Sequence, residues 1–153
     1  MIVVVGLGNP LRGDEGVAVR IVQELEPAFG NRPDVRLLDI GTSGMRLLDA
    51  LAGADRAVIV DCARMGEEPG TIMRFRADDV TSRRQEESIT PHSGDLLRLI
   101  DLARRLGACP EETVLFGIEP VSLDYREGLT ALIEERLPLY VQRIADEIDR
   151  PAT

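Results

Sequence analysis

The sequence predicts an α/β fold: a three-layer α/β/α arrangement around a mostly parallel, twisted five-stranded sheet with one antiparallel edge strand. Short apolar runs rich in valine and isoleucine alternate with longer segments that have helical periodicity. The first run, residues 1–7, is almost continuously apolar, which is typical of a central strand covered on both faces. A short apolar segment after the turn at residues 66–70 is expected at the sheet edge, as the antiparallel strand.

The expected elements alternate along the chain. Strands are expected at residues 1–7, 35–40, 56–62, 71–75 and 113–118. Helices are expected at residues 14–29, 45–51 and 93–106, and from about residue 127 with an interruption or kink at Pro138. Residues 77–91 are polar and lack periodicity, which predicts a mobile loop.

Length and composition limit the possible classes of protein. The 153 residues, 44% of them apolar, fit a single domain over residues 1–153. A net charge of −9 disfavours nucleic-acid or membrane partners. No apolar run is long enough to span a bilayer, and the apolar start lacks the charged region and the cleavage site of a signal peptide, so we expect a cytoplasmic protein. All 18 basic residues are arginine, which excludes lysine chemistry. Cys62 and Cys109 lack a C-x-x-C spacing and are expected to be buried free thiols.

Acidic side chains end several of the predicted strands. Asp39, Asp61 and Glu119 follow three strands, and Glu15 begins the helix after the first strand. Ligands of parallel sheets bind beyond the carboxyl ends of the strands, so we expect these acids to gather there. His92, the only histidine, begins the helix after the polar loop and could face the same crevice.

Glu15, Asp61 and His92 together form a candidate site for a zinc or nickel ion, with water in the remaining positions. Each residue also has a structural interpretation. Asp14 and Glu15 could stabilise the N-terminus of the first helix, and His92 could be an ordinary loop residue. The carboxylate of Asp61 ends an apolar strand and needs a partner or water.

Other kinds of site fit the sequence less well. Gly6-Leu7-Gly8 does not continue as a dinucleotide loop, because Leu11 stands where the third glycine belongs. One histidine cannot form H-E-x-x-H, and the turn GTSG lacks the G-x-S-x-G pattern of serine hydrolases. A Cys62–His92 nucleophile pair remains an alternative.

Five segments, in order and with their spacing, resemble the hydrogenase maturation endopeptidases. They are VGLGNPLRGDEGVAVR, DIGTSG, VIVDCARMGEEPGTI, TPHSGDLLRLI and VLFGIEP. The resemblance implies an endopeptidase that removes the C-terminal extension of a [NiFe]-hydrogenase large-subunit precursor after nickel insertion. The sequence departs from the family pattern at Ala18, where many members have glycine, and at Ser93 and Asp95.

The resemblance also implies roles for individual residues. The acid, aspartate and histidine with which the family contacts metal fall on Glu15, Asp61 and His92, which are then both the catalytic and the metal-contacting residues. The nickel is held by the substrate, and the free protein is expected to bind zinc or another divalent ion only weakly, because it offers a single histidine. Either the metal or a carboxylate could activate the attacking water.

The turn that begins at Gly41 has two interpretations. Asp39, Gly41, Thr42 and Gly44 could recognise the substrate at the rim of the crevice, or the turn could simply connect a strand to a helix.

Two alternative functions are left open. VGLGNP also resembles the start of peptidyl-tRNA hydrolases, although the histidine and asparagine that follow in that family are missing here. A maturation chaperone that binds nickel or precursor without cutting it is the other alternative.

Overall fold

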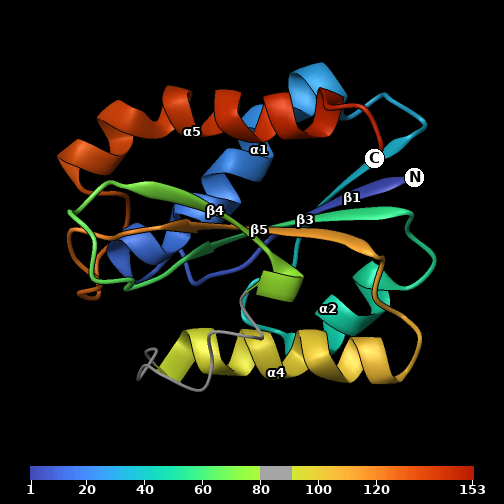
Figure 1. Cartoon of the computed structure of the whole chain (residues 1–153). Coiled ribbons are helices and arrows are strands. Elements are labelled where there is room, and N and C mark those ends of the chain that lie inside the picture. Colours follow the sequence, from blue (N-terminus) through green and yellow to red (C-terminus); the bar gives the residue numbers. More distant parts are fainter. Residues whose placement is uncertain (80–90) are drawn as a thin grey trace.

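The predicted three-layer α/β/α fold is confirmed by the computed structural model, which describes residues 1–79 and 91–153, with side chains left out at 91–95. The sheet has five strands in the order β2-β1-β3-β5-β4. Helices cover both of its faces (Figure 1). Among the described residues, no helix combines the length and the apolar character needed to cross a membrane.

The strands follow the expected positions closely. Four strands run parallel: β1 (Ile2–Gly6), β2 (Val35–Asp39), β3 (Arg56–Cys62) and β5 (Glu112–Ile118). The edge strand β4 (Ile72–Arg76) pairs antiparallel with β5, as the sequence predicted. The four parallel strands therefore end at one edge of the sheet.

The four longer helices of the described residues are divided between the two faces of the sheet. Figure 1 shows α1 (Val17–Phe29) and α5 (Ala131–Asp149) on one face, and α2 (Gly44–Leu51) and α4 (Pro91–Arg105) on the other. Strand β1 explains why both faces must be covered, since Val4 packs in the cluster under α1 and α5 while Val3 and Val5 pack in the cluster under α2 and α4. All three valines are fully buried.

The predicted starts of two helices are wrong, and Pro138 does not interrupt the last helix. The first helix begins at Val17 rather than residue 14, because residues 13–16 form the 3-10 turn η1 (Gly13–Gly16). The last helix begins at Ala131 rather than near residue 127, and it continues through Pro138 without interruption. Proline removes one helical hydrogen bond, but the buried side chains on either side, from Ile133 to Ile148, hold α5 on the sheet.

The predicted loop at residues 77–91 can be compared with the structure only at residues 77–79 and 91. Residues 77–79 and 91 are helical, contrary to the prediction, and residues 80–90 lie outside the described part of the chain.

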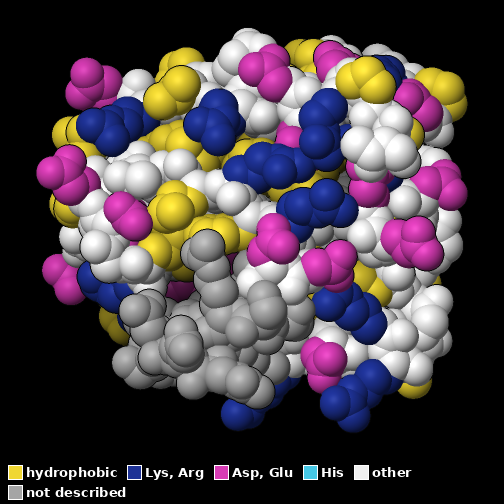
Figure 2. All heavy atoms as spheres, viewed as in Figure 1, with side chains coloured by type: hydrophobic (Ala, Val, Ile, Leu, Met, Phe, Trp, Pro, Cys, Tyr) yellow, Lys and Arg dark blue, Asp and Glu magenta, His cyan; other side chains and the backbone are white. Residues whose placement is uncertain are grey.

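Arginine side chains gather across the middle of one face, in the region of β4 and α5 (Figure 2). The edge strand contributes Arg74, whose guanidinium donates two hydrogen bonds, of 2.8 and 3.1 Å, to the carboxylate of Glu147 in α5. Charged side chains on an edge strand hinder pairing with another chain. Here one of them also ties the edge strand to the helix above it.

Candidate active site

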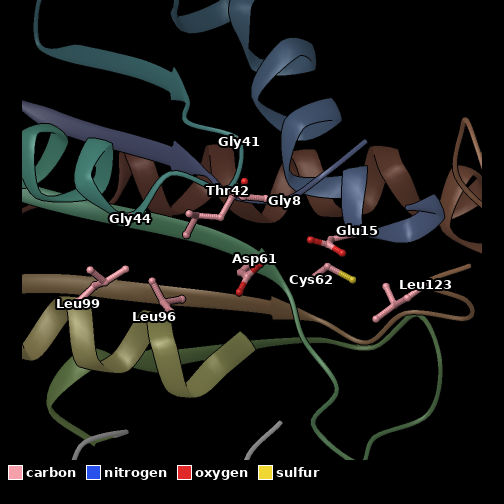
Figure 3. Close-up of a pocket in the computed structure, with 11 residues that line it drawn as sticks. Gly8, Glu15, Gly41, Thr42, Gly44, Asp61, Cys62, Leu96, Leu99 and Leu123 are labelled. Atoms are coloured by element: carbon pink, nitrogen blue, oxygen red, sulfur yellow. The ribbon is translucent and has the colours of Figure 1, made fainter. Parts of the chain in front are cut away.

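A pocket of about 140 Å³ lies at the carboxyl ends of β1 and β3. Its lining comes from separate segments of the chain, which Figure 3 shows converging. The lining residues are Leu7, Gly8, Glu15, Gly41, Thr42, Gly44, Asp61, Cys62, Leu96, Leu99 and Leu123. The pocket thus lies where a parallel sheet is expected to bind its ligand.

Glu15 is placed at the pocket by the turn between β1 and α1. Its backbone packs directly against Gly8, where a Cβ atom would lie 2.0 Å from the Glu15 carbonyl oxygen. Gly8 also has a φ of +143°, and its N–H donates to Gly41 at 2.9 Å. Only glycine fits at this position, and its close approach brings Glu15 to the pocket wall.

Asp14, next to Glu15, does not cap its own helix, as one interpretation of the sequence suggested. Its carboxylate is fully buried and accepts backbone hydrogen bonds from Val121 (2.9 Å), Ser122 (3.1 Å) and Thr130 (2.8 Å). The Thr130 hydroxyl donates to the same carboxylate at 2.9 Å. Asp14 therefore joins η1 to the loop that follows β5 and to the start of α5.

Asp61 enters the pocket from the end of β3. The pKa of its carboxyl is raised from 3.8 to about 7, mainly by burial. The backbone hydrogen bond of Cys62 lowers this pKa, and the nearby negative charge of Glu15 adds to the rise. The two carboxylates thus interact across the pocket, as Figure 3 illustrates. A carboxyl group with a pKa near neutrality can exchange a proton during a reaction at physiological pH.

Cys62 lines the same pocket but is poorly suited to act as a nucleophile. Burial, followed by the negative charges of Asp61 and other acids, raises the pKa of its thiol well above the usual range. The thiolate form that attacks a carbonyl is therefore disfavoured. This argues against the Cys62–His92 pair that the sequence left open.

His92 lies in the first turn of α4, and its side chain is outside the described part of the structure. The same helix contributes Leu96 and Leu99 to the pocket lining. Among the residues whose side chains are described, no group of three or more histidines, cysteines or acids could hold a metal ion. The structure thus places Glu15 and Asp61 at one pocket and His92 at the start of a helix that borders it.

The predicted recognition residues divide into two groups. Gly41, Thr42 and Gly44 line the pocket. The carboxylate of Asp39 instead accepts the N–H of Gly41 at 2.9 Å, and Asp39 is exposed. It orders the turn that presents the other three.

The carboxylate of Glu119 binds backbone N–H groups of the turn after β3. It accepts the backbone N–H groups of Met65 (2.7 Å) and Glu67 (2.9 Å), so it fixes the turn after β3.

One contact at Glu15 was not anticipated from the sequence. The guanidinium of Arg12 lies 3.3 Å from a carboxylate oxygen of Glu15. The three-residue spacing of opposite charges is a local signal that could have indicated the pair. The contribution of Leu123 has no such signal, because it is more than a hundred positions from Glu15.

Comparison with known proteins places the chain in a family. The sequence profile described as Hydrogenase maturation protease matches residues 19–147. The Hydrogenase 2 maturation protease of Escherichia coli is 34% identical over 144 residues, which cover 94% of this chain and 87% of that protein. The chain belongs to the hydrogenase maturation protease family.

Other members agree in sequence and in structure. The hydrogenase expression/formation protein HupD of Bradyrhizobium diazoefficiens is 34% identical over 137 residues, 89% of this chain and 71% of HupD. The solved structure of the hydrogenase maturating endopeptidase HybD from E. coli matches with a TM-score of 0.84 and 33% identity, over 96% of this chain and 91% of HybD.

Family membership establishes the type of enzyme. The chain is a hydrolase that acts on peptide bonds and has a role in hydrogenase processing. The pocket supplies what such chemistry needs at one place: two carboxylates, one with a pKa near neutrality, beside an open rim of glycines and leucines.

Proposed function

We propose that this protein removes the C-terminal extension of a [NiFe]-hydrogenase large-subunit precursor after nickel has been inserted, and that it recognises the nickel already held by that precursor. The observation that carries the proposal is the meeting of Glu15, from the turn between β1 and α1, and Asp61, from the end of β3, in a single pocket (Figure 3). Carboxylate oxygens are suitable ligands for a divalent ion whose other positions are filled by a partner.

His92 is the proposed third contact. Positions 92, 96 and 99 of α4 follow the four- and three-residue spacing that puts residues on one side of a helix, and the last two, Leu96 and Leu99, line the pocket. This spacing supports a place for position 92 near the pocket as well. Two carboxylates and one imidazole are a weak set for holding a free ion, which suits an enzyme that tests for metal in its substrate.

In the proposed reaction, the precursor's nickel meets these residues and the tail lies along the pocket rim. Gly41, Thr42 and Gly44 form that rim, where the two glycines add no side chains. Water adds across the scissile C–N bond, so that the mature subunit ends in a carboxylate and the tail leaves with a free amine. Positioning by the bound nickel limits cutting to loaded precursor.

The proposed partner is therefore a protein rather than a nucleic acid or a membrane. The net charge of −9 supports this, because it opposes attraction to phosphate groups. Both cysteines are free, which fits the reducing conditions of the cytoplasm, where we propose that the reaction takes place.

The decisive experiment incubates the purified protein with nickel-loaded and nickel-free precursor and measures the mass of the products. Tail loss from the loaded form alone is expected. Glu15→Gln and Asp61→Asn should abolish cleavage, whereas Glu127→Gln, which removes an exposed acid, should not change it. Equal cutting of both precursors would refute metal recognition, and no cutting of either would refute the proposed substrate.

A further inference from the structure

The ion pair at Glu15 is placed where a metal ion would have to bind. The Arg12 guanidinium nitrogen Nη1 lies 3.3 Å from Glu15 Oε2, and the two side chains are 27% and 12% exposed. Among the described residues, Glu15 Oε2 and Arg12 Nε are buried and lack a hydrogen-bond partner. The two charged groups are therefore close but not hydrogen-bonded to each other, and the Glu15 carboxylate can still accept another ligand.

Arg12 has a fixed backbone and a second contact for its side chain. Its neighbours Leu11 and Gly13 are hydrogen-bonded to Arg126 at 3.0 Å on either side, which joins the two loops at the pocket rim. The guanidinium also lies over the ring of Tyr125, 5.3 Å from its centre. Tyr125 is 82% exposed, so Arg12 can move away from Glu15 while keeping a favourable contact with the ring.

A divalent ion that binds Glu15 must compete with this arginine. The ion would have to break the pair and would be repelled by the guanidinium as long as it remained nearby. A nickel ion carried by a protein partner has further contacts to offset this cost, whereas a free ion has none. The same arginine therefore discriminates between the two.

We propose that Arg12 is a specificity-determining residue that pairs with Glu15 in the free protein and keeps free divalent metal ions off that carboxylate until the metal-loaded partner displaces it. The inference rests on the proposed function, because it assumes that Glu15 meets the precursor's nickel. It adds the residue that makes the site unresponsive to nickel in solution.

The test measures nickel binding to the free protein by isothermal titration calorimetry, with no precursor present. Arg12→Gln should bind nickel about three- to fivefold more tightly than the unaltered protein, the effect expected when one partly exposed ion pair no longer has to be broken. Arg12→Lys, which keeps the charge, should bind as weakly as the unaltered protein. Arg126→Gln is the matched control, because it removes the same charge from the loop that is hydrogen-bonded to Leu11 and Gly13, and it should change the affinity less than twofold.

A double variant shows whether the gain depends on Glu15. Adding Glu15→Gln to Arg12→Gln should cancel the increase in affinity. The inference is overturned if Arg12→Gln binds nickel no more tightly than Arg126→Gln, if Arg12→Lys gains as much as Arg12→Gln, or if Arg12→Gln shows no binding at millimolar nickel.

These results are independent of the precursor assay. The proposed function fails when the unaltered protein does not distinguish loaded from nickel-free precursor, and that result needs no arginine variant. The present inference fails on nickel affinities alone, even where cleavage of loaded precursor proceeds as expected.

Discussion

Replacing Asp14 by asparagine should destabilise the fold strongly, although the two side chains have nearly the same shape. The carboxylate is fully buried and accepts the N–H groups of Val121, Ser122 and Thr130 together with the Thr130 hydroxyl. Asparagine has one acceptor oxygen, so its amide must point its own N–H at a backbone N–H. At least one buried donor is left without an acceptor, whichever way the amide is turned.

The expected size follows from these contacts. A buried donor without a partner costs about 1–3 kcal/mol, and each hydrogen bond that loses its charged acceptor is weakened by roughly 1 kcal/mol. The three backbone bonds together give a predicted loss of about 3–5 kcal/mol in the free energy of unfolding. That is a large part of the roughly 5–15 kcal/mol that stabilises a typical domain.

Urea unfolding of the two proteins measures this difference directly. Asp124→Asn is the matched control, since Asp124 lies exposed in the same loop, and it should change stability by less than about 0.5 kcal/mol. A loss below about 1 kcal/mol for Asp14→Asn would refute the proposed role of Asp14 in holding the loop. Hydrogen exchange in residues 121–130 should rise in the variant, because those N–H groups lose their acceptor.

Three further predictions concern packing and charge. Glu147→Gln should cost about 1–3 kcal/mol at neutral pH, since Arg74 loses its charged acceptor, whereas Arg56 and Arg150 keep Glu112 at 3.2 and 3.7 Å. Burial raises the pKa of Glu147, but its arginine partners lower it below the usual 4.5 overall, so the cost should shrink as the pH falls through this lowered pKa in a urea unfolding series. Tyr140→Phe removes a buried 2.6 Å hydrogen bond to the Gly70 carbonyl and should lower thermal stability by about 1–2 kcal/mol, and an unchanged melting temperature would contradict this. Gly8→Ala should displace the Glu15 backbone, and it should abolish precursor cleavage even in preparations that remain folded by circular dichroism.

The fold was predictable because its signals are local. The apolar run of β1 and the alternation of strands with periodic helices each lie within a short stretch of sequence, and together they define a covered parallel sheet. The errors arose where a distant contact overrides a local pattern. Asp14 has the residue type and position of a helix cap, but its partners lie more than a hundred positions later, in the loop before α5.

The site was predictable in part for the same reason. Glu15 and Asp61 were identifiable because the ends of parallel strands share one edge, which is a rule of topology and needs no knowledge of side-chain contacts. Leu123 could not be identified in this way, because nothing near it in the sequence indicates which loop folds over the pocket. Asp39, the last residue of β2, and Glu119, which follows β5, lie at the same edge of the sheet as Asp61, yet their carboxylates accept hydrogen bonds from backbone N–H groups.

The pocket wall spans most of the chain, from Leu7 to Leu123. A nascent polypeptide therefore lacks a complete pocket until β5 and the loop that carries Leu123 have been synthesised and packed. Local opening of the loop held by Asp14 would switch the enzyme off again without complete denaturation.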